Sequence, residues 1–387
     1  MHVLIPVLHR PTEPTGVCRH AVNLAQCLVK TIHIDHVTLL IGEWQKMYFE
    51  KSFDLNSPKI KTIAIDIPNT SSSRNLWFLF GLPKVAQQLH PDIIHLAFPL
   101  PFIRRWFDRP LVSTIHDLYP YDYPENFGYP QVWFNQLFLK QCVYSSDGLT
   151  CVSKTTLNSL SQYFPSINRK NQARAVIYNY VNFDSKSLIV PSDIEACPPS
   201  NFILCVAQHR KNKNLDLLIK AFAQLVERKT YPSLKLILVG GTGPETENLE
   251  NLVNVLSLRS EVLFLSALSD QELCWLYNNC QVFAIPSSTE GFCLPLVEAL
   301  FFGSRVVCSN ISIFREVTEV ASDRCQFFNL SGDSLANLTV VLEKALSLKN
   351  SESCFSIKDK FSEEVISKQL TDFYSQVQTN SIYQESV

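Results

Sequence analysis

Two glutamates eight residues apart, Glu290 and Glu298, flank a short loop that begins with Gly291. The loop follows the apolar run Val282–Ile285, and a helix that begins near Phe292 would leave its first backbone N–H groups free to bind an anion. Glu298 would then lie about two turns into the helix, among apolar neighbours, where a carboxylate needs a hydrogen-bonding partner. We therefore predict that Glu298 accepts hydrogen bonds from a sugar hydroxyl; the alternative is a glutamate on a solvated helix face.

Three cations, Arg210, Lys211 and Lys213, lie between the apolar run Phe202–Ala207 and the helix predicted at Leu215–Arg228. In open parallel sheets ligands bind outside the carboxyl ends of the strands, so these side chains are placed where a ligand would bind. Arginine binds a diphosphate through its forked guanidinium, and lysine acts as a point charge. The segment therefore predicts a diphosphate site, with a solvated turn as the alternative.

Weaker signals come from a histidine and from glycines beside apolar runs. His116, next to Asp117, directly follows a predicted strand, which favours a functional histidine over a structural one. Gly16 opens the first predicted helix, where the missing side chain lets a ligand approach the backbone. Gly240 and Gly241 end another apolar run, but they do not complete the GxGxxG pattern of dinucleotide-binding proteins, and a plain turn explains them equally well.

Nearly continuous apolar runs alternate with amphipathic helical segments in two series, which predicts two parallel sheets with helices on both faces. We expect two doubly wound, Rossmann-like α/β domains that face a central cleft. The first comprises residues 1–183 and the second residues 202–360, joined by a proline-containing linker at 184–201. A polar helical tail at 361–387 either packs back on the first domain or frays.

The individual elements follow from the same alternation. The expected strands are Val3–Leu8, Val37–Ile41, Ile60–Ile65, Ile93–Ala97, Leu111–Ile115, Leu149–Val152, Ala175–Tyr178, Phe202–Ala207, Leu234–Val239, Val262–Leu265, Val282–Ile285, Arg305–Cys308 and Gln326–Phe328. The expected helices are Val17–Val29, Leu76–Leu89, Val132–Tyr144, Lys154–Tyr163, Leu215–Arg228, Glu245–Leu258, Asp270–Cys280, Phe292–Phe302 and Leu335–Leu348.

The composition excludes several classes of protein. Apolar residues make up 46% and charged residues 18% of the 387 residues, which is typical of a folded globular chain and not of a disordered one. No apolar run reaches the roughly 18 residues that a membrane span needs, and residues 1–6 lack the pattern of a secretion signal. We therefore expect a cytoplasmic protein whose 12 cysteines, none in a CxxC pair, are buried free thiols and not metal ligands.

Charge is divided unevenly along the chain, with 17 Lys and Arg against 12 Asp and Glu in residues 1–182 and an acidic remainder. This basic excess is small and forms no stripe interleaved with aromatic residues, which argues against nucleic-acid binding. Aromatic and basic side chains do gather at Phe102–Phe107, which includes Arg104 and Arg105. The segment predicts a peripheral contact with the inner face of a membrane; the alternative is that the rings pack at the edge of the cleft.

Taken together, these residues resemble the GT-B glycosyltransferases of family 4, also described as glycosyl transferases group 1, which are retaining enzymes that use nucleotide-sugars. The resemblance covers residues 1–348. Glu290–Glu298 resembles the family's E-x7-E motif, and Lys213–Leu215 resembles its Lys-Asn-Leu segment. Ile115–Leu118 resembles the segment that contains the family's catalytic histidine, and Val176–Asn179 the segment that closes its first domain.

The resemblance implies a role for each of these side chains. Arg210 and Lys213 would hold the donor diphosphate and stabilise charge on the leaving group. Glu298 would bind the donor ribose, and Glu290 would contact the transferred sugar. His116 would hydrogen-bond that sugar near the reacting carbon. The further donor-binding positions are Gly16, Gly240, Gly241, Gly291, Phe292, Cys293 and Leu294.

The chain departs from the family pattern at four places. Tyr180 stands where members commonly have glycine, and Cys293 replaces the second glycine of their Gly-Phe-Gly-Leu-Pro segment. Asn212 stands where an arginine usually precedes the lysine, which leaves Arg210 as the nearest substitute. A single glycine, Gly16, follows Thr15 where members often have two.

The activity implied by the resemblance is transfer of a sugar from a UDP-, GDP- or ADP-sugar to a hydroxyl of a sugar or lipid-linked acceptor, with retained configuration. The product would belong to a polysaccharide, a glycolipid or another glycoconjugate. The sequence has no Asp-x-Asp motif, and cations can neutralise the diphosphate, so we expect no required metal and no cofactor besides the nucleotide-sugar co-substrate. Two alternatives remain open: a nucleotide-sugar epimerase or hydrolase on the same fold, and an inactive, glycosyltransferase-like binding protein.

Overall fold

The computed structural model describes residues 1–10, 15–126, 128–169, 172–181, 188–348 and 355–385. The chain divides into two compact units, each of which is the predicted doubly wound α/β type. Unit 1 comprises Met1–Tyr180 together with Phe361–Val387, and unit 2 comprises Val181–Lys360. The expected linker at 184–201 lies partly outside the described residues, and its described part contains a short 3-10 turn at Ser192–Ile194.

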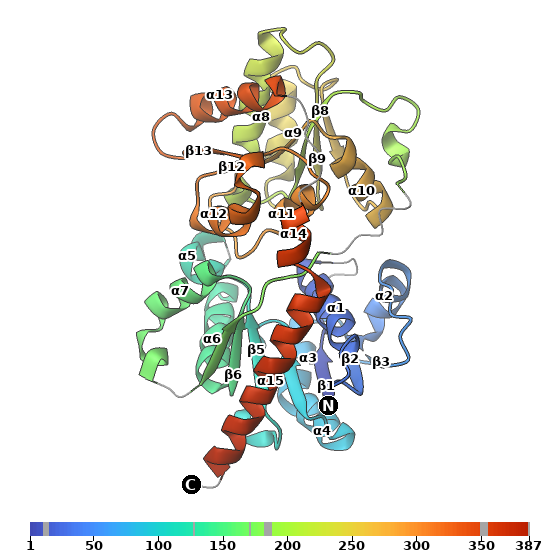
Figure 1. Ribbon diagram of the computed structural model, residues 1–387, viewed down its shortest axis with the longest axis vertical. Coiled ribbons are helices and arrows are strands. Elements are labelled where there is room, and N and C mark those ends of the chain that lie inside the picture. The colour runs from blue at the N-terminus through green and yellow to red at the C-terminus, as the bar shows by residue number, and fades with distance from the viewer. Residues whose placement is uncertain (11–14, 127, 170–171, 182–187, 349–354, 386–387) are drawn as a thin grey trace. The chain divides into compact units, whose positions relative to one another are not determined.

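Unit 1 contains a seven-stranded parallel sheet in the order β3-β2-β1-β4-β5-β6-β7 (Figure 1). The chain winds outward from β1 in one direction and then, from β4 onward, in the other, which is the doubly wound topology. The strands are β1 (His2–Pro6), β2 (His36–Gly42), β3 (Ile60–Ile65), β4 (Ile93–Leu96), β5 (Leu111–Ile115), β6 (Gly148–Cys151) and β7 (Ala173–Val176).

The sheet of unit 1 buries side chains on both of its faces. Along β1, Val3 and Ile5 belong to one hydrophobic cluster and Leu4 belongs to the other, as the two-residue repeat of a strand requires. Both clusters are almost fully buried, and burial of apolar area is the main force that holds the strands between helices. This arrangement explains why central strands such as β1 are nearly continuous apolar runs, whereas the edge strand β3 contains exposed polar residues.

The helices of unit 1 mostly lie where the periodicity predicts them. They are α1 (Gly16–Val29), α2 (Lys46–Ser52), α3 (Ser71–Leu76), α4 (Leu82–Leu89), α5 (Tyr119–Asp122), α6 (Gln131–Ser145), α7 (Lys154–Tyr163) and α15 (Glu363–Glu385). The helix predicted over Leu76–Leu89 is present, but it begins earlier, at Ser71, and a π-helical turn at Trp77–Gly81 lies between α3 and α4. Pro83, in the first turn of α4, has no backbone N–H with which to continue an α-helical ladder.

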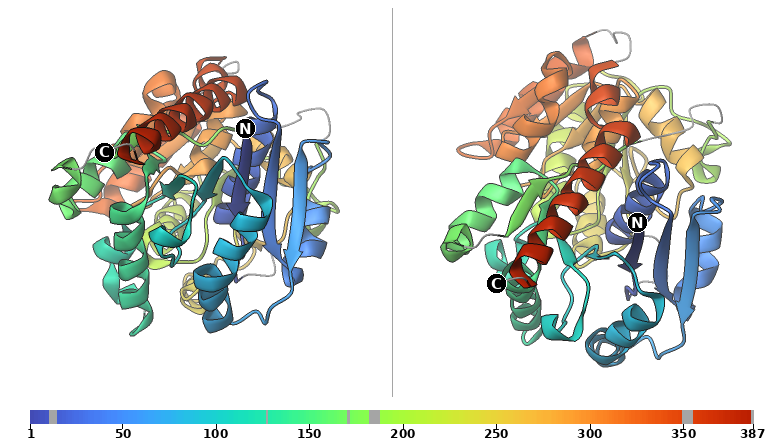
Figure 2. Two further views of the ribbon diagram at one scale, coloured as in Figure 1. Left: turned by 90° about the horizontal axis from the view of Figure 1, so that it is seen from below. Right: turned by 60° about the horizontal axis from the view of Figure 1, so that its bottom comes forward.

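The last helix of the described chain, α15, packs on unit 1 beside α1 and β7 (Figure 2). It is not uniformly polar: Ile366, Leu370, Phe373, Tyr374 and Val377, spaced at helical intervals, are buried in the same cluster as Val3. A methyl group on Gly148 of β6 would lie 2.6 Å from the Val377 side chain, so β6 accepts the helix only because this residue has no side chain. The predicted tail is therefore an integral layer of unit 1.

A buried polar chain fixes α15 to the sheet. The His95 ring bonds through Nδ1 to the Tyr374 hydroxyl (2.5 Å) and through Nε2 to the Thr114 hydroxyl (2.7 Å). Thr114 in turn bonds to the hydroxyl of Thr150 (2.8 Å). Burial lowers the pKa of His95 to about 3, so the ring is neutral at pH 7 and its two nitrogens are satisfied by hydroxyl groups.

Unit 2 contains a six-stranded parallel sheet in the order β10-β9-β8-β11-β12-β13. Its strands are β8 (Phe202–Val206), β9 (Lys235–Val239), β10 (Val262–Leu265), β11 (Val282–Ile285), β12 (Val306–Ser309) and β13 (Cys325–Phe328). Its helices are α8 (Leu215–Glu227), α9 (Thr246–Val255), α10 (Asp270–Asn279), α11 (Leu294–Phe301), α12 (Ser312–Thr318), α13 (Ser334–Ser347) and α14 (Phe355–Lys360). The two central strands, β8 and β11, end side by side and carry the residues considered below.

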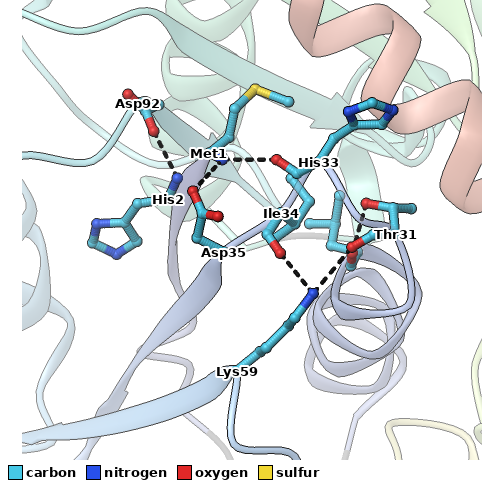
Figure 3. A network of polar contacts seen from close by, with 9 residues as sticks. Met1, His2, Thr31, His33, Ile34, Asp35, Lys59 and Asp92 are labelled. Atoms are coloured by element: carbon cyan, nitrogen blue, oxygen red, sulfur yellow. Dashed lines mark hydrogen bonds and ion pairs between the residues drawn. The ribbon is translucent and has the colours of Figure 1, made fainter.

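A polar network closes the edge of unit 1 where β1 begins (Figure 3). Lys59 donates from Nζ to the carbonyl oxygens of Thr31 (3.1 Å) and Ile34 (2.9 Å), which follow α1. The carboxylate of Asp92 accepts a hydrogen bond from the backbone N–H of His2 (2.7 Å). These bonds satisfy backbone groups that the sheet ladder leaves unpaired.

Two further expectations concern thiols and membranes. The cysteines in the described ranges are free thiols, and all of them except Cys197 are buried, as predicted. None of the helices in the described part of the chain combines the length and the apolar character needed to cross a membrane.

We expect Tyr374→Phe to lower the free energy of unfolding by about 1–3 kcal/mol, because it leaves the buried His95 ring without one of its partners. Urea denaturation followed by circular dichroism measures the change. Tyr144→Phe is the matched control, since the Tyr144 hydroxyl bonds to Ser166 at an exposed position and its loss should cost less than about 0.5 kcal/mol. Equal stability of Tyr374→Phe and the wild type would contradict the structural role of the buried chain.

Candidate functional site

The loops that follow β8 and β11 are tied together by hydrogen bonds. The backbone N–H of Ser288 donates to the carbonyl of Asn212 (2.8 Å), and the Asn214 side chain donates to the carbonyl of Pro286 (2.9 Å). Asn214 has a left-handed backbone (φ 49°), a conformation that asparagine tolerates better than most residues, and α8 begins directly after it. The two loops therefore form one structure at the carboxyl edge of the sheet in unit 2.

This structure brings Lys213 and Glu290, 77 residues apart in sequence, into direct contact. The Lys213 ammonium lies 2.6 Å from Oε1 of Glu290, and both side chains are largely buried. The hydroxyl of Ser287 donates to the same carboxylate oxygen (2.8 Å). A fixed cation and a fixed carboxylate thus stand together at the end of β8, where the sequence predicts a ligand.

The loop between Glu290 and α11 differs from its prediction in one respect. The helix begins at Leu294 and not near Phe292, because Cys293 has a left-handed backbone (φ 66°) that cannot belong to an α-helix. Pro295, in the first turn, contributes no N–H. The predicted donors of Phe292 and Cys293 therefore precede the helix, and Glu298 lies about one turn into it and not two.

The conformation of Cys293 also explains its place in the motif. A left-handed backbone favours glycine, and a side chain there costs roughly 1–2 kcal/mol. The Cys293 side chain is nevertheless buried beside Cys205 and the Lys213–Glu290 pair, where burial raises the pKa of its thiol well above the usual value. Cys293 therefore acts as a small apolar residue in the loop and not as a nucleophile.

Glu298 is buried on α11 and has an internal partner. The hydroxyl of Tyr277, on α10, donates to its Oε2 (2.7 Å). Burial, and next the negative charge of Glu298, raise the pKa of Tyr277 well above its usual value, so the phenol stays protonated and keeps its proton for this bond. The prediction that a carboxylate at this position needs a partner is thus met inside the protein, by a residue that the sequence analysis did not identify.

The remaining predicted positions of unit 2 lie at the same edge of the sheet. Arg210 is exposed and precedes the short turn Lys211–Lys213. A side chain on Gly240 would lie 2.0 Å from the carbonyl oxygen of Ala207, so glycine is required there for the loops after β8 and β9 to pack. Gly241 is exposed, and a side chain on it would meet no heavy atom of the described residues within 4 Å.

In unit 1, His116 follows β5 directly, as predicted. Its Nε2 lies 2.7 Å from the carbonyl oxygen of Ala97, which can only accept, so Nε2 carries the proton and Nδ1 presents a lone pair. Burial lowers the pKa of His116, outweighing the opposite effects of the Ala97 carbonyl and of Asp117, and the ring is neutral at pH 7.

The His116 ring is held from the side by a second histidine. The ring of His20, on α1, packs against it edge-on at 4.5 Å between centroids. His20 is fully buried, its Nδ1 lies 2.5 Å from Oδ1 of Asn179, and burial lowers its pKa well below the usual value. Asn179 belongs to the segment that, by resemblance, closes the first domain, so the structure gives this segment a contact with the histidine pair.

Gly16 begins α1, and among the described residues beyond its chain neighbours and its own helix, no heavy atom lies within 4 Å of the position that a side chain on it would occupy. Thr15 caps the helix: its hydroxyl accepts a hydrogen bond from the backbone N–H of Cys18 (3.4 Å). Gly16 is exposed within the described part of the chain, and its contact with a ligand stays a prediction. Residues 11–14, which precede it, lie outside the described residues.

The aromatic segment Phe102–Phe107 is mostly turned inward. Phe102 and Phe107 are buried in the core of unit 1, and Arg104 forms an ion pair with Asp147 (2.8 Å). These contacts favour the packing alternative over a membrane contact, because the two phenylalanine rings are not available at the surface. Within the described ranges, no group of three or more His, Cys, Asp and Glu side chains is arranged to hold a metal ion.

The sequence did not identify Tyr277, His20 or Ser287 as members of these clusters. Ser287 lies three residues before Glu290, so its proximity could have been found from the motif itself. Tyr277 and His20 contact residues 21 and 159 positions away in sequence, respectively, and no local pattern marks either of them. Their roles become visible only when the helices that carry them are packed.

Comparison with known proteins identifies two family matches. Residues 193–344 match the family described as Glycosyl transferases group 1, and residues 14–185 match Glycosyltransferase Family 4. The O-antigen chain mannosyltransferase RfbU of Salmonella typhimurium is 27% identical over 78% of this chain and 80% of its own length. The O-antigen chain mannosyltransferase B of Escherichia coli is 25% identical over 79% of this chain and 83% of its own length.

Solved structures share the fold at lower sequence identity. Sucrose-phosphate synthase from Thermosynechococcus elongatus matches 98% of this chain and 99% of its own, with a TM-score of 0.73 and 18% identity. Anabaena HepE, solved in complex with UDP and glucose, matches 97% of this chain and all of its own, with a TM-score of 0.70 and 19% identity. The two family matches together cover most of the chain, and each unit contains a parallel sheet like those of the matched structures. The chain therefore belongs to the group 1 glycosyltransferases of the GT-B fold.

Proposed function

We propose that the protein transfers a sugar, with retention of configuration, from a nucleotide-diphosphate-sugar to a hydroxyl group of a growing polysaccharide or other glycoconjugate. The observation that carries this proposal is the contact between Lys213 and Glu290 at the carboxyl ends of β8 and β11. The relatives named above act on O-antigen chains as mannosyltransferases, which supports mannose as the sugar. The HepE structure contains UDP, which supports a nucleoside diphosphate as its carrier.

The cations of unit 2 would act on the diphosphate. A diphosphate that approaches Lys213 competes with Glu290 for the ammonium, and Arg210, which is exposed in the same loop, adds a forked donor. When the bond between sugar and diphosphate breaks, negative charge develops on the leaving oxygen, and cations already in position stabilise it without reorganisation. Glu290, once it shares Lys213 with the phosphate, can accept a hydrogen bond from the transferred sugar.

The carboxylate and the neutral histidine would orient the donor. Glu298 accepts hydrogen bonds from ribose hydroxyls, since an ionised carboxylate is an acceptor only. Nδ1 of His116 would accept a hydrogen bond from a sugar hydroxyl, because the proton on Nε2 is donated to the Ala97 carbonyl. Gly16, Gly240 and Gly241, with the backbone of Gly291 to Leu294, would supply close backbone contacts to the donor. Together these contacts restrict the sugar to a reactive geometry, which is a large part of catalysis in such transfers.

The experiment that tests the function offers the purified protein UDP-, GDP- and ADP-sugars, mannose included, with a lipid-linked saccharide as acceptor. We expect a glycoside from one donor. Lys213→Ala and Glu298→Ala should each lower the transfer rate about a hundredfold or more while the protein remains folded at the assay temperature. Lys220→Ala, which removes an exposed lysine from α8, is the matched control and should keep full activity. Free sugar or an isomer formed from the donor alone would favour the hydrolase or epimerase alternative, and donor binding without turnover would favour the inactive binding protein.

We expect His116→Ala to lower kcat by at least about tenfold while the KM for the donor changes less than about threefold, because the hydrogen bond acts on the sugar and not on the nucleotide. Steady-state kinetics at saturating acceptor measures both constants. His33→Ala removes an exposed histidine from the same unit and controls for the loss of a ring. Full turnover by His116→Ala would show that this residue does not contact the reacting sugar.

We also propose that transfer requires no metal, because Lys213 and Arg210 supply the positive charge that a divalent cation supplies in other transferases. Activity should be unchanged within error after dialysis against EDTA and should not rise when Mg²⁺ or Mn²⁺ is added back. A loss of activity that Mn²⁺ restores would overturn this part of the proposal and leave the transfer reaction itself in place.

A further inference from the structure

We propose that Tyr277 is a positioning residue for the donor: its hydroxyl orients the Glu298 carboxylate and thereby determines how tightly the nucleotide is bound. The proposal rests on the proposed function, which assigns ribose binding to Glu298. Tyr277 itself does not contact the donor in this scheme, and it acts only through the carboxylate.

The geometry joins two helices of unit 2. Tyr277 is on α10 and Glu298 is on α11, and the hydroxyl lies 2.7 Å from Oε2, the distance of a strong hydrogen bond to a charged acceptor. The Tyr277 side chain is 1% exposed and Glu298 is 6% exposed. Because water has little access to either group, the orientation of the carboxylate is determined by its protein partners.

The Tyr277 ring is itself held in place. It stacks on the ring of Phe302, with an interplanar angle of 12° and 5.9 Å between centroids, and it packs at a tilt against Phe283 of β11. Its backbone carbonyl accepts a hydrogen bond from the hydroxyl of Ser304 (2.8 Å). A ring restrained from these sides presents its hydroxyl at one position, so the bond to Glu298 is directional.

The energetics follow from the burial. A buried carboxylate without enough hydrogen-bond donors either rotates toward another donor or takes up a proton, and both changes reduce its ability to accept from a ribose hydroxyl. The Tyr277 hydroxyl prevents both, because it donates to Oε2 and because its own pKa is raised well above the usual range. Loss of this single oxygen should therefore weaken nucleotide binding while the packing of the ring is retained.

Tyr277→Phe is the test variant, since it removes the hydroxyl and keeps the ring. The probes are UDP and GDP, each as the ribonucleotide and as its 2′-deoxy and 3′-deoxy forms, and isothermal titration calorimetry on the full chain measures their affinity. We expect Tyr277→Phe and Glu298→Gln each to lower the affinity for the ribonucleotide about tenfold, the effect of losing a hydrogen bond to a charged group. For at least one deoxy form, which lacks the hydroxyl that Glu298 would bind, the same substitutions should lower the affinity less than about twofold.

The matched control is Tyr374→Phe, which also removes a buried tyrosine hydroxyl but does so in unit 1. It should lower the melting temperature and leave nucleotide affinity unchanged. A general loss of stability in Tyr277→Phe would lower the affinities for the ribonucleotide and for the deoxy forms by the same factor. A larger loss of affinity for the ribonucleotide therefore distinguishes a positioning role from a structural one.

Two outcomes overturn the inference in distinguishable ways. If Glu298→Gln lowers the affinity for the ribonucleotide and Tyr277→Phe does not, Tyr277 has no positioning role and the proposed function stands. If Glu298→Gln binds like the wild type, the ribose assignment of the proposed function fails and the inference fails with it. Should Tyr277→Phe not fold, Phe302→Leu replaces it, because it loosens the ring and keeps the hydroxyl; it should weaken the ribonucleotide selectively, and equal effects on all forms would contradict the inference.

Discussion

The candidate site depends on one ion pair, formed by Lys213 and Glu290 at the ends of two neighbouring strands. Largely buried ion pairs are poor sources of stability, since the cost of removing two charges from water offsets most of their attraction. Their presence at this edge is better explained by chemistry. The pair keeps the Lys213 ammonium in a fixed position while Glu290 neutralises its charge. The Ser287 hydroxyl donates to the Glu290 carboxylate, which a diphosphate would displace from Lys213 in the proposed function. The hydrogen bonds between the two loops keep this arrangement in register.

The two units have chemically different groups at the carboxyl ends of their strands. In unit 2 the strand ends present charge, which suits a phosphate, whereas in unit 1 the end of β5 presents His116 in a neutral form. This neutrality is a consequence of burial: the His20 and His116 rings pack edge to face, and burial lowers the pKa of both. Both arrangements rely on the open topology of parallel sheets, in which loops at the carboxyl edge are free of ladder hydrogen bonds.

The sequence predicts most of the architecture because parallel strands that are buried on both faces can be recognised as apolar runs. β3, β5, β10 and β11 have the bounds predicted for them. The short helix α12 is not predicted, since seven residues give too little periodicity, and the left-handed backbone of Cys293 is invisible to periodicity altogether. For the candidate site, the sequence indicates which residues carry charge but not which of them pair, because partners such as Tyr277 come from a separate helix whose packing is decided by the whole core.

The packing of α15 on unit 1 has a consequence for biosynthesis. A ribosome completes the segment of unit 2 before it reaches residues 363–377, yet the core of unit 1 contains side chains from that final stretch. Unit 1 therefore cannot complete its core until these residues have been synthesised, and until then one of its apolar faces stays uncovered. The half that is translated first is completed last, and its uncovered apolar surface is open to aggregation in that interval.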